Sequence, residues 1–243
     1  MPIGFIASNS SMITCGSNST LNNQEPFILS GWVRPDTLGI GSLGIIACKR
    51  LAFTSSGQWT FQVVTNNCLY FVKDYSTTDL QYCTTNNVFT LRTPFHFILA
   101  WNGSNGTGGI KIYVNGISVN TTAAATVHGV GTKQVDTFQS FNIGGSRNLF
   151  AAFSGLISTV GFWGSATIDT ITIDNLSKSK IAYAPLQFTP STGGLRAFWP
   201  LNDFPESFSI PNSSNVMDKS LNSNTGSVNL TPIAYADQIN TYS

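Results

Sequence analysis

Residues that could carry out acid–base catalysis are scarce in this chain of 243 residues. Hydrolysis of a glycosidic bond generally needs two carboxyl groups held roughly 5–9.5 Å apart. The two glutamates are Glu25, which precedes a proline at the start of a predicted strand, and Glu206, which lies in a proline-containing loop. Asp203 lies three residues before Glu206, but nothing in the sequence makes the two converge. The carboxylates therefore do not indicate a hydrolase.

Nucleophilic catalysis is not indicated either. The histidines are His96, inside the apolar run Phe95–Trp101, and His128, in a polar connection. No Gly-x-Ser-x-Gly nucleophile motif accompanies them. A packed structural role is the expectation for His96. We expect the protein not to be an enzyme.

The cysteines lack the spacing of a metal site; they are Cys15, Cys48, Cys68 and Cys83. If a strand at Cys68–Lys73 pairs with one at Thr78–Cys83, Cys68 lies directly opposite Cys83. Opposed residues of that kind have Cα atoms about 4.5 Å apart, within the range of a disulfide. Two alternatives stay open, a Cys68–Cys83 disulfide and buried free thiols.

A sugar-binding surface needs an exposed aromatic ring beside amide side chains. In the same hairpin, alternation places one set of side chains toward the core and the other toward water. The core set is Leu69, Phe71, Leu80 and Tyr82, and the wetter set is Tyr70, Val72, Asp79 and Gln81. Tyr70, Gln81 and Tyr75, at the tip of the loop, are therefore the candidate carbohydrate-binding residues.

The elements that position these residues are predicted to be strands. In the segment 95–119, an alternating apolar run stops at Asn115-Gly116 and restarts at Ile117. An Asn-Gly pair between two such runs is typical of a two-residue hairpin, whose turn needs positive φ at both positions. Similar runs recur along the chain at Pro26–Val33, Trp59–Val64 and Gly155–Trp163. The sequence predicts an all-β sandwich or jelly roll.

Composition excludes some partners. Charged residues make up 9% of the chain, against roughly 25% in ordinary soluble domains, and the net charge is +1. Such a chain has no field that would attract nucleic acid or an anionic membrane. No run approaches the roughly 20 apolar residues of a membrane span, and the first residues do not resemble a secretion signal.

The order of the motifs resembles a known family. GWVRPDTLG, GIIACK, GQWTFQV, FHFILAWNGS, GGIKIYVNGISV, FNIGG and FSGLISTVGFW follow one another over roughly residues 5–165. This succession is similar to the laminin-G-like domains of the concanavalin A-like lectin/glucanase superfamily. The resemblance implies a two-sheet antiparallel jelly-roll sandwich. It does not imply one function, because the fold serves lectins, glucanases, adhesion modules and structural domains.

The resemblance also bears on chemistry. Glucanases of this fold carry two Glu on one strand, a pattern that this chain lacks. Laminin-G-like domains often bind Ca²⁺ at the rim, and the loop Asp218–Asn224 could do so with Asp218 as its charged ligand. The alternative is a turn capped by Asp218. No other cofactor is expected.

The C-terminal part departs from a single module. We expect a jelly roll at 1–165, a connecting segment with a short helix at 166–194, and an extension at 195–243 that packs on the sandwich or on a neighbouring subunit. The extension is rich in aromatic residues expected to dock a partner, namely Phe198, Trp199, Phe204 and Phe208.

Low charge, a polar uncharged surface and the lack of catalytic residues favour a structural or adhesion protein. The first hypothesis is a protein on the outside of a virus particle, a capsid decoration or tail-associated protein, with weak binding of surface glycans. Its partners would be shell subunits or further copies of the chain, with neither nucleic acid nor membrane. The alternative is a secreted or surface carbohydrate-binding lectin.

Overall fold

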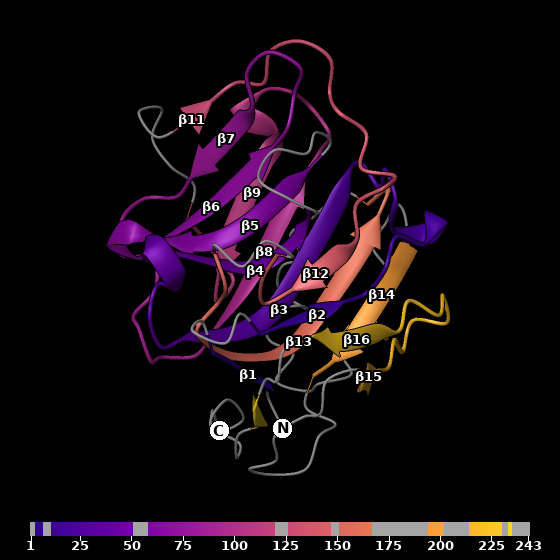
Figure 1. The fold of residues 1–243 in the computed structure, drawn as a ribbon. Coiled ribbons are helices and arrows are strands. Elements are labelled where there is room, and N and C mark those ends of the chain that lie inside the picture. The colour runs from indigo at the N-terminus through magenta and orange to yellow at the C-terminus, as the bar shows by residue number, and fades with distance from the viewer. Residues whose placement is uncertain are drawn as a thin grey trace.

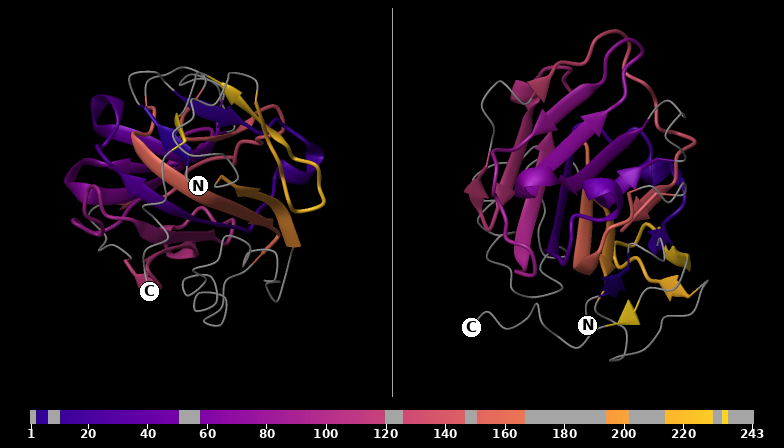
Figure 2. Two further views of the ribbon diagram at one scale, coloured as in Figure 1. Left: turned by 90° about the horizontal axis from the view of Figure 1, so that it is seen from below. Right: turned by 60° about the vertical axis from the view of Figure 1, so that its left-hand side comes forward.

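The structure is a computed structural model that describes residues 3–6, 11–50, 58–119, 126–146, 151–166, 194–201, 214–229 and 233–234. Within these residues the chain forms two antiparallel sheets with one apolar core, and no α-helix (Figure 1; two further views in Figure 2). The predicted all-β sandwich is confirmed.

The first sheet, sheet A, has eight strands in the described residues. Along the sheet they are β10 (Ile117–Ser118), β9 (Ile110–Val114), β8 (Phe95–Trp101), β3 (Phe27–Pro35), β13 (Gly155–Gly164), β1 (Ile3–Phe5) and β17 (Ile233–Ala234). The eighth strand, β14 (Gly194–Pro200), pairs with the second half of β13, while β1 pairs with the first half.

The second sheet, sheet B, has nine strands in the described residues. In order they are β11 (Thr126–Val127), β7 (Leu80–Cys83), β6 (Cys68–Lys73), β5 (Trp59–Val64), β4 (Leu43–Lys49), β12 (Phe141–Ile143), β2 (Met12–Thr14), β16 (Gly226–Asn229) and β15 (Asn215–Val216). In the part of the chain that the structure describes, short 3₁₀ turns join strands at Ser19–Leu21, Ile40–Ser42, Thr65–Asn67 and Thr107–Gly109.

Alternation along each strand fills the space between the sheets. On β8 the residues Phe95, Phe97 and Leu99 point into the shared core, and their neighbours point outward. Aromatic rings from both sheets meet there, and Phe27 lies 5.1 Å from Trp59 between ring centroids. The burial of large apolar side chains on both inner faces is the main stabilising contribution to the sandwich.

The predicted hairpin at Asn115-Gly116 is present between β9 and β10. Asn115 has φ 50° and Gly116 has φ 80°, the left-handed values that the two-residue turn requires. The pairing of Ile117 with Val114 then fixes the register of the short strand β10.

The C-terminal strands complete the two sheets of the sandwich. β14 lengthens sheet A, and β16 pairs with β2 in sheet B (Figure 1, orange and yellow). Phe198 and Trp199 are fully buried within the chain, so the expectation that they dock a partner is wrong. Trp199 instead packs on Phe141, at 4.9 Å between ring centroids. Phe204, Phe208 and the predicted helix lie outside the described residues.

Candidate functional site

The outer faces of the two sheets differ in character. The outer face of sheet A carries large apolar side chains that are fully buried, among them Ile28, Ile98 and Trp163. The outer face of sheet B carries hydroxyl and amide side chains, as at Thr60 and Gln81. The middle of sheet B therefore offers a polar ligand more hydrogen-bonding groups than the apolar cluster on sheet A does.

Tyr70 and Gln81 form the accessible part of that polar face, on β6 and β7. Both are partly exposed, and the Tyr70 hydroxyl donates a hydrogen bond of 2.6 Å to Gln81 Oε1. Gln62 is the residue opposite Tyr70 on β5, and Cys83 is opposite it on β7. The prediction that Tyr70 and Gln81 share a partly wet face agrees with this arrangement.

Partial burial changes the chemistry of the tyrosine. Burial, together with the charges of Cys83 and Asp79 that oppose a negative phenolate, raises the pKa of Tyr70 to about 12. The hydroxyl therefore stays protonated at neutral pH and remains a hydrogen-bond donor. The bond to Gln81 holds the amide, whose NH₂ group can donate to a ligand.

Tyr75 does not belong to this surface. Its side chain is only 8% exposed, and its ring packs so closely on Gly129 that any Cβ there would collide with it. The expectation of an exposed Tyr75 at the loop tip is therefore wrong. The loop 128–133 covers the ring, through β-bridges from Tyr75 to Lys133 and from Thr78 to Val130.

Two carboxylates lie at the end of the same face, on either side of the β6–β7 loop. Asp74 accepts a hydrogen bond of 3.1 Å from the Gln58 backbone N–H, and Asp79 accepts one of 3.1 Å from the Tyr75 N–H. Burial raises the pKa of Asp74, the Gln58 N–H lowers it, and the charge of Asp79 adds to the increase. Both carboxylates therefore hold the backbone at the ends of the loop.

The predicted register of the β6–β7 hairpin is wrong by two residues. Cys83 lies opposite Tyr70, so Cys68 and Cys83 are diagonal neighbours and not an opposed pair. Both are free thiols that lie within hydrogen-bonding reach of each other. The loop 74–79 is two residues longer than expected, and because a shift of two preserves the alternation, the predicted faces are unchanged.

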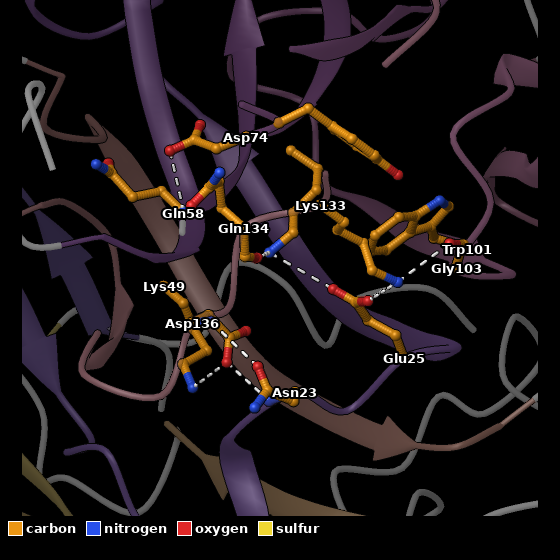
Figure 3. A network of polar contacts seen from close by, with 12 residues as sticks. Asn23, Glu25, Lys49, Gln58, Asp74, Trp101, Gly103, Lys133, Gln134 and Asp136 are labelled. Atoms are coloured by element: carbon orange, nitrogen blue, oxygen red, sulfur yellow. Dashed lines mark hydrogen bonds and ion pairs between the residues drawn. The ribbon is translucent and has the colours of Figure 1, made fainter. Parts of the chain in front are cut away.

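A buried network of charged side chains links β4 to neighbouring loops (Figure 3). Lys49 has no exposed surface, and its Nζ lies 3.1 Å from Asp136 Oδ1. The ammonium also donates to the Leu21 carbonyl at 2.9 Å and to Asn22 Oδ1 at 2.6 Å. Asp136 in turn accepts a 2.7 Å bond from the Asn23 N–H. The lysine thus joins β4 to two loops.

A second group of charges lies beside the first (Figure 3). Lys73 Nζ donates to the Gln134 carbonyl at 2.8 Å and lies 3.5 Å from Glu25 Oε1. Glu25 also pairs with Lys133, whose ammonium lies 5.3 Å from the centroid of the Trp101 ring. Glu25 therefore neutralises two lysines, which gives it a structural role.

The sequence indicates part of this network through the alternation of its strands. Lys73 falls on the same face of its strand as Leu69 and Phe71, the set that alternation assigns to the core. Lys49 and Lys73 are the residues opposite Trp59 on its two sides, so the register brings them to one row of the inner face. Their partners Asp136 and Glu25 come from distant loops, and no pattern in the sequence predicts these pairings.

His96 has the packed role that was expected. It is 3% exposed on the outer face of sheet A, with Nε2 2.8 Å from Ser30 Oγ and its ring 5.4 Å from that of Trp32. Burial lowers the pKa of His96 to about 3, so the imidazole is neutral at physiological pH. No partner for its Nδ1 lies among the described residues.

Asp218 caps its own loop. One oxygen accepts bonds from the Phe198 N–H at 2.9 Å and the Ser220 N–H at 2.8 Å. The other accepts from the Ser220 hydroxyl at 2.9 Å and the Asn224 N–H at 2.8 Å. This arrangement is the Asp-capped turn that stood as the alternative to a Ca²⁺ site.

In the part of the chain that the structure describes, no three or more His, Cys, Asp or Glu side chains gather as a metal site would require. None of the described helices has the length and apolar character of a membrane span.

Comparison with known proteins identifies the family. The model of the concanavalin A-like lectin/glucanases superfamily, in its laminin-G-like branch, matches residues 8–169. The chain belongs to this family. The resemblance seen in the order of the motifs is thereby confirmed. Among curated proteins none matches the chain.

Solved structures show the same fold at low identity. A Bacteroides ovatus protein for which carbohydrate binding has been proposed superimposes with a TM-score of 0.61 and 16% identity over 97% of this chain. The chain spans 60% of the length of that structure. A heptameric pentraxin of Limulus polyphemus matches with a TM-score of 0.42 and 13% identity, over 70% of this chain and 82% of its own. At 16% identity the likeness to the Bacteroides ovatus protein shows the fold alone.

Proposed function

We propose that the protein is a carbohydrate-binding, lectin-like module, and that it acts outside the cell or on a surface. The observation that carries the proposal is the half-exposed Tyr70, hydrogen-bonded to Gln81 on the polar outer face of sheet B. An aromatic ring offers an apolar surface to the C–H groups of a sugar, and the amide offers donors and acceptors to its hydroxyls.

Membership of the concanavalin A-like lectin/glucanases superfamily and the fold shared with the Bacteroides ovatus protein also support a lectin-like function. They give no support to the hypothesis of a virus-particle protein, and Phe198 and Trp199, two of the residues predicted to dock a partner, are buried within the chain. The lectin alternative is therefore the one we carry forward.

We further propose that the binding is not coupled to hydrolysis. Glu25 is engaged by Lys73 and Lys133, while Asp74 and Asp79 accept backbone hydrogen bonds at the ends of a loop. Each of these carboxylates is therefore occupied by a structural contact, whereas a pair of catalytic acids must be available to the substrate.

The test begins with a glycan array probed with the purified wild-type chain, followed by mapping of a hit through changes in backbone amide shifts. Shifts concentrated at residues 69–72 and 80–83 are expected. A hit whose shifts cluster elsewhere would contradict the location of the site, and the absence of any hit would contradict the proposed function. Incubation with the same glycans should release no reducing ends.

A further inference from the structure

A cavity lies at one end of the outer side of sheet A, on the side of the sandwich away from Tyr70. Its volume is about 140 Å³, and its lining residues come from β8, β9, the loop between them and the residue Ala166 after β13. They are Ala100, Trp101, Asn102, Gly108, Gly109, Lys111 and Ala166. A cavity of about 150 Å³ can hold a six-membered ring, so the size suits one small cyclic molecule.

The floor of the cavity is apolar and rigid. Ala100 and Ala166 are almost fully buried on the outer side of sheet A. The neighbouring Trp101 ring lies in the core between the sheets, 5.7 Å from the ring of Phe27 between centroids, and anchors this end of β8. The strand pairing of Ala100 with Lys111 fixes the adjoining part of β9. Such a floor requires a ligand that presents a carbon skeleton.

The wall of the cavity is the loop 102–109. Its base is closed by a bond of 2.9 Å from the Asn102 N–H to the Gly109 carbonyl, and Asn102 Oδ1 accepts a bond of 3.0 Å from the Ser104 N–H. Gly109 cannot be another residue without displacing these side chains, since any Cβ there would collide with Asn102 and Ser104. The wall is thus formed in the absence of a ligand.

The polar groups that remain are donors. Among the described residues, neither Lys111 Nζ nor Asn102 Nδ2 has a hydrogen-bond partner or an acidic neighbour, and both residues are exposed. One ammonium supplies one charge, which suits a monoanion such as a carboxylate.

We propose that this cavity binds the carboxylate-bearing ring of an acidic monosaccharide, either free or at the end of a glycan. The ring would lie on Ala100 and Ala166, the carboxylate would pair with Lys111, and Asn102 would donate to a ring substituent. The site is distinct from the Tyr70 surface, so either can be present without the other.

The test follows backbone amide shifts of the full chain during titration with glucuronate, glucose and acetate. Glucuronate should produce saturable shifts at residues 100–102, 108–111 and 166, and Lys111→Gln should weaken its binding at least fivefold. Glucose should bind at least fivefold more weakly than glucuronate. Because the ion pair is exposed, raising the salt concentration should also weaken glucuronate binding.

A matched pair of glycine variants tests the location. At both Gly108 and Gly194 an added Cβ would meet nothing within 4 Å, but only Gly108 lines the cavity. Gly108→Leu should abolish the glucuronate shifts, whereas Gly194→Leu should leave them unchanged.

Equal binding of glucose and glucuronate, unaffected by Lys111→Gln, would overturn the assignment of an anionic ligand. Equal binding of acetate and glucuronate would overturn the assignment of a sugar ring. Failure of glucuronate to shift these amides at up to about 50 mM would overturn the site altogether. None of these results depends on whether Tyr70→Ala alters binding at the other surface.

Discussion

At the scale of single residues, the protein tolerates buried ionisable groups because each has a specific partner or is held neutral. His96 is the clearest case of the second kind, since its imidazole lies between Ser30 and Trp32 with almost no exposure. A histidine in that position affects how stability responds to acid.

His96 should make the fold less stable below pH 6.5. Its pKa is lowered to about 3 in the folded chain, while an unfolded histidine has a pKa near 6.5. Between these values the unfolded state binds the extra proton, so the free energy of unfolding falls as the pH falls. At about 1.4 kcal/mol per pKa unit, the loss from pH 6.5 to 4.5 is about 2–3 kcal/mol.

Urea unfolding of the wild type and of His96→Gln at a series of pH values would measure this effect. The difference between the two chains should shrink by about that amount on acidification, because the variant lacks the titrating group. A difference that stays constant with pH would contradict the buried, neutral state of His96.

Asp136 should be needed because Lys49 is buried. Burial lowers the pKa of Lys49, and the charge of Asp136 acts against that decrease. Asp136→Asn would leave the ammonium without a counter-ion, at a cost of about 3–5 kcal/mol. The double variant with Lys49→Met should be less destabilised than Asp136→Asn alone in urea unfolding. If the double variant and Asp136→Asn lost the same free energy of unfolding, the loss would not come from an unpaired Lys49 ammonium.

At the scale of elements, the β15–β16 connection shows how loops secure strands. Four hydrogen bonds converge on Asp218, and one of them comes from Phe198 on β14. Asn224 adds a bond to the Arg196 carbonyl at 2.7 Å and accepts the Trp199 indole N–H at 2.8 Å. The loop therefore fastens sheet A to the last strands of sheet B.

Asp218→Ala should destabilise the chain by about 3 kcal/mol, since buried backbone donors lose a charged acceptor. We expect the loss to be the same with millimolar Ca²⁺ and with a chelator, and Asp218→Asn to lose less because one oxygen remains. Thermal unfolding in both buffers measures it. If Ca²⁺ raised the unfolding temperature of the wild type but not that of Asp218→Ala, Asp218 would be a metal ligand.

Strands were predictable where the pattern is local. Phe95–Trp101, the Asn115-Gly116 hairpin and Gly155–Trp163 follow from alternation, unbroken apolar runs and turn residues, and all are present in the fold. The β6–β7 register was not predictable, because Asp74 and Asp79 fix the length of that loop by binding backbone donors. Alternation specifies the face of a residue but not its partner.

At the scale of the whole molecule, the sandwich is completed from both ends of the sequence. β1 and β14 lie along the same edge of β13, and β16 pairs with β2. Such distant pairings leave no spacing signal, so the sequence predicts that residues 195–243 pack on the sandwich or on a neighbouring subunit but does not predict which strands β14 and β16 join. Among the described residues that line the cavity at Lys111, most lie within residues 100–111, and only Ala166 comes from a distant part of the sequence.

The two faces of the completed sandwich account for the proposed function. The outer face of sheet A is apolar and buried around Ile28, Ile98 and Trp163, while sheet B presents Tyr70 and Gln81 on a polar surface. A glycan is therefore expected to bind at Tyr70. Tyr113 on sheet A, which is also partly exposed, is a matched control.

The most direct test is the dissociation constant of the strongest array glycan, measured by calorimetry for the wild type, Tyr70→Ala and Tyr113→Ala. Loss of one aromatic contact and its hydrogen bond should weaken binding about tenfold or more, which corresponds to at least about 1.4 kcal/mol. Tyr113→Ala should stay within about twofold of the wild type. Unchanged affinity in a folded Tyr70→Ala variant would contradict the assignment of the site to sheet B.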